Sequence, residues 1–526
     1  MGGGLMQLVA YGAQDVYLTG NPQITFWKVT YRRHTNFAME SIEQTFNGQA
    51  DFGRRVNCTI SRNGDLAYRT YLQVTLPEIN KSMGENDVNY ARWLDFPGHQ
   101  LIETVEVEVG GQRIEKQYGD WMHIWCQLTM SKEQERGYYK MVGNTTQLTF
   151  VTDPAFANVD GPCDSDAPRQ VCAPRNALPE TTLYVPLQFW FCSNPGLALP
   201  LIALQYHEVK INLDFRAIDE CLWAVKSLSE ASAEAKSTTS YAQSLVSASL
   251  YVDYVYLDTD ERRRMAQNPH EYLIEQLQHT GAESVGSSSN KIRLNFNHPV
   301  KELVWVVQPD CHVDYCSSTQ GGNTLYKALG AQPFNYTDAV DALPNSIKAF
   351  GSHVGDGQFV TGDQFETAMA EGTEGAVTSD QAWAGVDAAN GLNTSGVSDA
   401  GTFVLAESSL DMHCWGENPV VTAKLQLNGQ DRFSEREGTY FDQVQPWQHH
   451  TRAPDTGINV YSFALRPEEH QPSGTCNMSR IDNATLQLVL SNATVEGTNT
   501  AKVRVYARNY NVLRIMSGMG GLAYSN

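Results

Sequence analysis

Two histidine-glutamate pairs are the residues in this 526-residue chain whose types could support metal-dependent hydrolysis: His207-Glu208 and His270-Glu271. A zinc-protease helix needs a second histidine four residues after the first, so that both rings reach one metal ion from the same helical face. Neither pair has that second histidine. The chain also contains no Gly-Lys dipeptide, which excludes a phosphate-binding P-loop.

Two other short motifs could carry chemistry but fit it poorly. Residues Gly396–Gly401 approximate the sharp turn that presents a nucleophilic serine, yet the motif is one residue too long. His449 and His450 stand beside Trp447 and could hold a metal ion. We interpret this pair as part of a hydrogen-bonded loop, because no further ligand pattern accompanies it.

Acidic residues with calcium-like spacing occur at Asp160, Asp164 and Asp166. They lack the downstream glutamate and the fixed loop length of a calcium-binding loop, so they are interpreted as a solvated turn. The sequence therefore predicts no catalytic residue, no cofactor site and no metal site.

The ten cysteines include no C-x-x-C pair. Cys311 and Cys316 flank His312, and Cys163 and Cys172 flank a loop rich in Pro and Asp. Zinc sites prefer tighter spacings, and no secretory signal is visible at the amino terminus, so free thiols in a reducing compartment are expected. A disulfide between Cys163 and Cys172 is the alternative.

Eight Asn-x-Ser/Thr sequons could be glycosylated in a suitable compartment. Only Asn335 and Asn393 are candidates, because both lie in a long insertion that is expected to project from the protein. The other six are Asn57, Asn80, Asn144, Asn477, Asn483 and Asn492.

The composition is that of a globular β-rich protein. Hydrophobic residues make up 41% of the chain and charged residues 18%, and the 41 glycines, 21 prolines and 24 tyrosines suit many strands joined by turns. The formal net charge of −21 disfavours direct binding to nucleic acid or anionic lipid. Two basic clusters, Arg32-Arg33-His34 and Arg262-Arg263-Arg264, are interpreted as a solvated edge or a salt-bridged linker.

A pattern of strands and turns occurs twice along the chain. Val107–Gln112 is echoed by Leu425–Gln430, each a strand pattern closed by a Gly-Gly or Asn-Gly turn that supplies the positive φ angles of a tight hairpin. The echo continues in three further pairs: Gly119 and Trp121 with Gly438 and Tyr440, Val209–Phe215 with Leu486–Leu490, and Tyr251–Leu257 with Lys502–Arg508. The repeat predicts two similar β-domains in tandem.

We therefore expect an arm at residues 1–23, a first β-domain at 24–258, a connector at 259–269, a second β-domain at 270–516 and a tail at 517–526. Ile24–Tyr31 is expected to be the first strand, and Gly119–Thr129 and Ser131–Tyr138 are expected to be helical, with Ser131 able to cap the second helix. The second domain contains an insertion at about 310–418 that has no Lys or Arg between Lys348 and Lys424 and is dense in Gly, Ala, Asp, Ser and Thr. Because such a segment cannot fill a core, it is expected to face water.

Three stretches resemble a known family. Gly12–Lys28 closely resembles the amino-terminal signature of the major capsid proteins of nucleocytoplasmic large DNA viruses, and so does Asn194–Lys210. The block from Asn428 through Tyr440-Phe441 to Leu465 is similar to the second-domain core of that family. The resemblance covers essentially the whole chain.

The resemblance implies an all-β double jelly roll, made of two eight-stranded antiparallel jelly rolls with long loop insertions and a few short helices. It also implies a homotrimer whose pseudo-hexagonal capsomers tile an icosahedral shell over an internal membrane, next to neighbouring capsomers, penton proteins and minor capsid proteins. In relatives, long loops of the second jelly roll rise as towers. The alternative from the residues alone is a carbohydrate-binding or glycoside-cleaving jelly-roll protein, which gel filtration would distinguish from a trimer.

Overall fold

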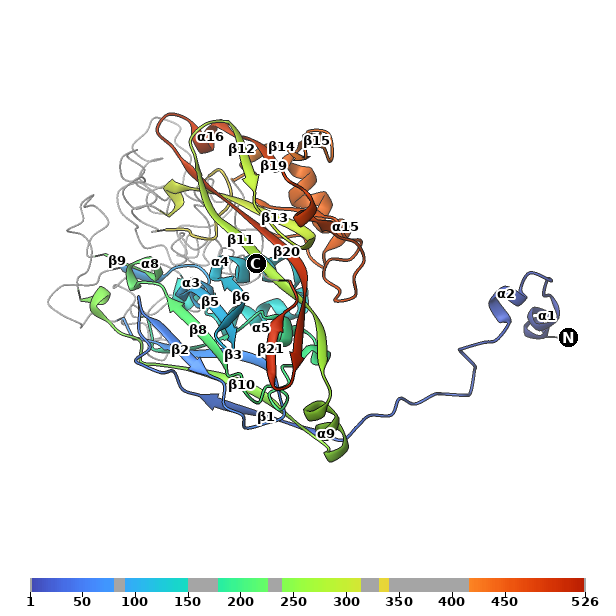
Figure 1. Cartoon of the computed structure of the whole chain (residues 1–526). Helices are drawn as coiled ribbons and strands as arrows, with labels where there is room; N and C mark the ends of the chain where they lie inside the picture. The colour runs from blue at the N-terminus through green and yellow to red at the C-terminus, as the bar shows by residue number, and fades with distance from the viewer. Residues whose placement is uncertain are drawn as a thin grey trace, which may run out of the picture.

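The computed structural model describes residues 2–79, 90–149, 178–225, 239–313, 331–339 and 416–524. Within these ranges the chain forms two β-sandwiches, with an arm that extends away from the first of them (Figure 1). The sandwiches are connected by α9 (Thr259–Gln267), which lies within the segment 259–269.

The first sandwich has two four-stranded antiparallel sheets. One has the order β1-β10-β3-β7 and the other the order β2-β8-β5-β6. The strands are β1 (Phe37–Gln44), β2 (Arg55–Thr59), β3 (Leu66–Leu76), β5 (Ile102–Val109), β6 (Gln112–Tyr118), β7 (Thr181–Pro186), β8 (Val209–Phe215) and β10 (Ser247–Leu257).

The second sandwich repeats this plan strand for strand. Its sheets contain the orders β11-β20-β13-β17 and β12-β19-β14-β15, so the eight strands are connected in the same sequence as those of the first sandwich. They are β11 (His270–Val285), β12 (Ser289–Leu294), β13 (Pro299–Pro309), β14 (Val420–Leu427), β15 (Gln430–Asp431), β17 (Ile458–Ser462), β19 (Ala484–Leu490) and β20 (Ala501–Met516). Two eight-stranded jelly rolls in tandem are therefore confirmed.

The remaining helices and strands are short and lie outside the eight-stranded plan of the two jelly rolls. The strands among them are β4 (Tyr90–Trp93), β9 (Leu222–Val225), β16 (Arg436–Glu437), β18 (Cys476–Asn477) and β21 (Met519–Leu522). The α-helices are α1 (Gly3–Val9), α2 (Val16–Thr19), α3 (Pro97–Leu101), α4 (Gly119–Thr129), α5 (Lys132–Val142), α6 (Thr146–Thr149), α7 (Trp190–Ser193), α8 (Ile218–Cys221), α15 (Gln445–His449) and α16 (Asn492–Val495). None of the helices in the described ranges is long and apolar enough to cross a membrane.

The two predicted hairpins have matching turns. Gly110 and Gly111 have φ values of 59° and 83° between β5 and β6, and Asn428 and Gly429 have values of 51° and 79° between β14 and β15. These are left-handed conformations that glycine and asparagine adopt at low cost. The hairpin turns predicted from the repeat are confirmed.

The repeated glycines after the hairpins also have equivalent places. A Cβ atom on Gly119 would lie 2.2 Å from the carbonyl oxygen of Ile102, the first residue of β5. A Cβ atom on Gly438 would lie 1.9 Å from the carbonyl oxygen of Val420, the first residue of β14. In both jelly rolls only glycine allows the chain after the hairpin to pass this close to the start of the hairpin's first strand.

The expected helices α4 and α5 are confirmed, although Ser131 makes no side-chain capping bond to the helix backbone. In α9, Arg262 Nε lies 3.0 Å from Asp65 Oδ1, so this basic cluster is a salt-bridged linker, as interpreted from the sequence. Three apolar clusters hold the fold together. One fills each jelly roll, and the third lies between α4 and the outer faces of β13, β17 and β20.

Two expectations about the ends of the first jelly roll and the insertion are wrong. Residues Ile24–Tyr31 form no strand; their side chains are exposed and the arm continues to Asn36, because no neighbouring strand in the described chain pairs with them. The insertion does not face water throughout, because Phe334 and Tyr336 are buried in the third apolar cluster. This short apolar segment was missed because the expectation rested on the average composition of the whole insertion.

The expected tail instead forms a hairpin that enters the other jelly roll. Ser517 and Gly518 adopt positive φ angles, and β21 pairs with the end of β20. Leu513 and Ile515 belong to the apolar cluster of the first jelly roll, and the Gly520 N–H lies 3.1 Å from His207 Nδ1. The last strands of the chain thus pack against the core of the first jelly roll (Figure 1).

Candidate functional site at the junction of the jelly rolls

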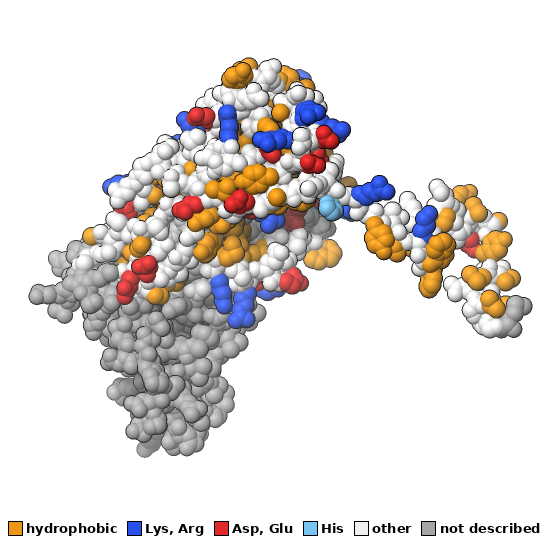
Figure 2. Space-filling view, turned by 90° about the horizontal axis from the view of Figure 1, so that it is seen from below, with side chains coloured by type: hydrophobic (Ala, Val, Ile, Leu, Met, Phe, Trp, Pro, Cys, Tyr) orange, Lys and Arg blue, Asp and Glu red, His pale blue; other side chains and the backbone are white. Residues whose placement is uncertain are grey.

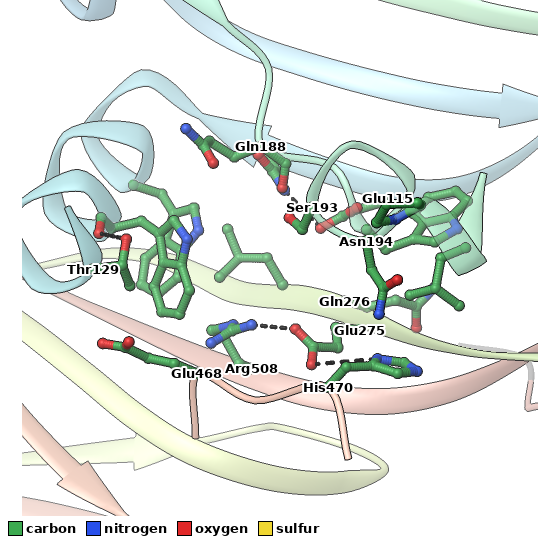
Figure 3. A pocket seen from close by; sticks show the side chains of 17 residues that line it. Glu115, Thr129, Gln188, Ser193, Asn194, Glu275, Gln276, Glu468, His470 and Arg508 are labelled. Atoms are coloured by element: carbon green, nitrogen blue, oxygen red, sulfur yellow. Dashed lines mark hydrogen bonds and ion pairs between the residues drawn. The ribbon is translucent and has the colours of Figure 1, made fainter. Parts of the chain in front are cut away.

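A cavity of about 340 Å³ lies where the two jelly rolls meet. Figure 3 shows polar and aromatic side chains converging on it from both halves of the chain. Its lining residues include Glu115 from β6, Trp125 from α4, Glu275 from β11, Glu468 and His470 from the loop after β17, and Arg508 from β20.

Arg508 is the centre of this site. Its guanidinium forms ion pairs with Glu275 and with Glu302, the latter with Nη1 2.9 Å from Oε1, and it lies 3.8 Å from the centroid of the Trp125 ring. Burial opposes the charge, but Glu275 and Glu302 keep the pKa of Arg508 above its usual value. A cation between two carboxylates and an aromatic face is a strongly held structural group.

Lys301 brings a second buried cation to the same carboxylates. Its Nζ lies 2.5 Å from Glu275 Oε1 and 5.0 Å from the centroid of the Tyr510 ring. Burial and the nearby Arg508 charge lower the pKa of Lys301 to about 8, although Glu275 favours the charged form. Lys301 and Arg508 therefore share the Glu275 carboxylate, and the charge of Arg508 disfavours the charged form of Lys301.

His450 forms ion pairs at both ring nitrogens. Nε2 lies 3.0 Å from Glu302 Oε2, and Nδ1 lies 2.9 Å from Glu468 Oε1. His449 Nδ1 is 3.1 Å from the Leu465 carbonyl oxygen. The pair is hydrogen-bonded, as interpreted, but it lies at the carboxyl end of α15 and not in a loop. Among the residues that the structure describes, no group of three side chains could hold a metal ion.

This ion pair sets a pH window for stability. Burial acts against ionisation of both groups, but the partner charge raises the pKa of His450 to about 9 and lowers that of Glu302 to about 2. The histidine contribution is complete below an unfolded pKa of about 6.5 and is lost as pH rises through the folded value. The glutamate contribution is complete above an unfolded pKa of about 4.3 and is lost as pH falls through the folded value.

We therefore expect the stabilisation from this pair to be greatest between about pH 4.3 and pH 6.5. His450→Gln should flatten the part of the curve between neutral pH and about pH 9, which urea denaturation across a pH series would measure. His449→Gln is the matched control, since its ring contacts only a carbonyl. An unchanged pH dependence in the His450 variant would contradict the assignment.

Glu115 is the carboxyl group of the cavity that an enzyme would need as an acid. Burial raises its pKa to about 8, and Gln117 Nε2 donates to its Oε1 at 2.8 Å. A glycosidase would also need an available carboxylate, but Glu275 and Glu468 are held in ion pairs. These ion pairs stabilise the face of the second jelly roll on which Trp125 of the first jelly roll packs, and they do not resemble a hydrolytic pair.

The candidate glycosylation sites have different outcomes. Asn335 is 2% exposed, its Nδ2 donates to the Ala339 carbonyl oxygen at 3.0 Å, and its Oδ1 accepts from Thr337 N at 3.0 Å. The folded chain therefore does not present this amide to a glycosyltransferase. Asn393 lies outside the described residues.

Other sequence candidates also fall outside the described residues. They are Asp160, Asp164, Asp166, Cys163, Cys172, Cys316 and Gly396–Gly401. Cys311 and the five other described cysteines are free thiols.

The sequence reasoning missed the charge cluster at the junction. Its members are hundreds of residues apart, and only the fold brings Glu115, Glu275 and Arg508 together. One signal was available: Lys301 and Glu302 interrupt an apolar run from Val300 to Val307, and a charged pair inside a buried strand needs partners.

The arm is a second candidate surface. Large hydrophobic side chains gather along it in Figure 2, with exposed fractions from 54% for Leu5 to 104% for Phe26. Exposed apolar patches of this extent are typical of interaction sites.

Comparisons with known proteins agree over the whole chain. Residues 25–258 match the family described as major capsid protein N-terminus, and residues 261–521 match the large eukaryotic DNA virus major capsid protein family. The chain is 76% identical to the major capsid protein of Phaeocystis pouchetii virus and 71% identical to that of Chrysochromulina ericina virus, with 100% of each chain covered.

Solved structures give the same result. The quasi-atomic model of the PBCV-1 virus capsid is similar with a TM-score of 0.60 and 34% identity, covering 95% of this chain and 100% of that one. The Faustovirus major capsid protein has a TM-score of 0.61 at 13% identity, covering 96% of this chain and 94% of that one, and supports the fold.

Proposed function

Because this chain belongs to the major capsid protein family of large eukaryotic DNA viruses, we propose that three copies form a capsomer whose six jelly rolls make a pseudo-hexagonal block. The protein is a structural component of the virion capsid of a large double-stranded DNA virus, not an enzyme. The single observation that carries the trimer is the identical strand order of the two jelly rolls. Two similar domains let a three-fold object present six comparable edges.

These blocks would tile an icosahedral shell. Neighbouring capsomers, penton proteins and minor capsid proteins are the proposed partners, and an internal membrane lies beneath the shell. Contacts within a trimer should be large and apolar, whereas those between capsomers should be smaller and more polar. The net charge of −21 argues against direct contact with the genome.

Light scattering on gel-filtered protein tests the trimer. The expected mass is three times the 58.4 kDa of one chain. A protein that remains monomeric at high concentration contradicts the proposal.

Removing Gly2–Thr19 should leave trimers intact and impair shell formation. These residues have no buried side chain, so the jelly rolls lose no packing, whereas any contact that the arm makes in a shell is lost. Gel filtration measures the trimer and electron microscopy counts the shells. Loss of the trimer on this truncation would refute the expectation, and a full-length chain prepared in parallel is the control.

A further inference from the structure

Residues Ile24–Tyr31 have the composition of a β-strand but pair with no strand in the described chain. The segment ITFWKVTY is rich in β-branched and aromatic residues. Its apolar side chains are almost fully in water, from 68% exposed for Val29 to 104% for Phe26. A strand-forming segment in this state is suited to joining the edge of an existing sheet.

Strand β1 offers such an edge. It is the outermost strand of the sheet β1-β10-β3-β7, and no described strand lies on its other side. Phe37 and Met39 on β1 remain about half exposed, at 54% and 49%. An added strand would form hydrogen bonds with the unpaired backbone N–H and C=O groups of this edge and would cover these two side chains.

The charges of the two segments are complementary. The arm between Ile24 and His34 carries Lys28, Arg32 and Arg33 and no acidic residue. Strand β1 carries the exposed Glu40 and Glu43 and no basic residue. Opposite charges along two paired strands stabilise the pairing and favour this edge over a basic one.

Pairing of the arm with β1 of its own chain is disfavoured by the connection. A two-residue hairpin turn needs positive φ angles, and no residue from 22 to 36 is glycine or adopts a positive φ. The arm leaves the body in an extended path (Figure 1). A second copy is therefore the occupant that the geometry favours.

We propose that residues Ile24–Tyr31 of one copy add as a strand to the free edge of β1 in a second copy, extending its four-stranded sheet across the interface. This inference rests on the proposed function, because assembly supplies the second copy. The donor is the segment Ile24–Tyr31, the acceptor is the free edge of β1, and the basic residues of the arm face the acidic residues of β1.

Zero-length carbodiimide coupling tests this contact in native assembled shells, because it joins an amine and a carboxylate that touch. Lys28 is the only lysine of the arm. We expect amide links from Lys28 to Glu40 or Glu43. Shells assembled from a mixture of nitrogen-15-labelled and unlabelled chains should give mixed-isotope linked peptides by mass spectrometry.

Links only within one chain, or links from Lys28 only to other sites, would overturn the strand exchange and leave the proposed capsid function standing, provided trimers and shells form. A chain that never forms trimers would overturn both. The two failures are distinguished by light scattering on the same sample.

A charge exchange gives a second test. Lys28→Glu combined with Arg32→Glu should lower the yield of trapped copies about tenfold, measured with a photocrosslinker placed at Phe26. Adding Glu40→Lys and Glu43→Lys should restore it. Arg263→Glu with Arg264→Glu on α9 is the matched control and should change nothing; equal losses in both charge-reversal variants, or no rescue, would contradict the pairing.

Discussion

Replacing Arg508 by alanine is expected to lower the free energy of unfolding by about 3–5 kcal/mol. The substitution removes the cation between Glu275 and Glu302 and leaves Glu302, which is fully buried, with less compensation for its charge. It also removes the guanidinium from the face of Trp125. The two ion pairs lie within the second jelly roll, and the contact with Trp125 of α4 joins them to the first, so most of the loss should fall on the second jelly roll and a smaller part on the junction.

Urea denaturation followed by tryptophan fluorescence would measure this loss. The matched control is Arg514→Ala on the same strand, whose ion pair with Glu271 is exposed at 52% and 59% of the two side chains. An exposed pair contributes less than about 1 kcal/mol. If the two variants lose the same stability, the buried cluster contributes no more than an exposed ion pair.

Substituting either of the repeated glycines by alanine is expected to destabilise the fold by about 3 kcal/mol or more. A Cβ atom on Gly119 would lie 2.2 Å from the Ile102 carbonyl oxygen, and one on Gly438 would lie 1.9 Å from that of Val420. Backbone carbonyls at the start of a paired strand cannot move aside without breaking the sheet.

Thermal unfolding of Gly119→Ala and Gly438→Ala would show the loss in each jelly roll. Gly137→Ala in α5 is the matched control, since no atom lies within 4 Å of its added Cβ. That variant should be stabilised by about 0.5–1 kcal/mol through helix propensity. A neutral result at both repeated glycines would mean that their equivalence is accidental.

The tandem β-domains could be predicted from the sequence because each turn and strand pattern that indicates them lies within a few consecutive residues. The dipeptides Gly110-Gly111 and Asn428-Gly429 specify their own turn geometry. The alternation in β5 places Val105 and Val107 in the core, but Glu106 on the other face is also buried, by ion pairs with Arg55 and Lys116. The arm strand at Ile24–Tyr31 was wrong for the opposite reason, since strand composition forms a strand only where an edge is present to receive it.

The junction could not be predicted because its energy comes from residues that the sequence separates. Glu115 and Arg508 line one cavity only after two sheets have formed and packed. Phe334 was likewise missed, because one aromatic segment within a polar insertion becomes a core element only when the cluster around Phe96 and Tyr506 surrounds it.

The hairpin of β20 and β21 is synthesised last but packs against the jelly roll that is synthesised first. Leu513 and Ile515, together with the partly buried Leu522, supply apolar surface to the jelly roll that is made first. Because all eight strands of that jelly roll lie between residues 37 and 257, it can fold early, but this part of its apolar surface is covered only when the last strands have been made. Chains that terminate before β20 would leave this apolar surface exposed, and exposed apolar surface favours aggregation over assembly.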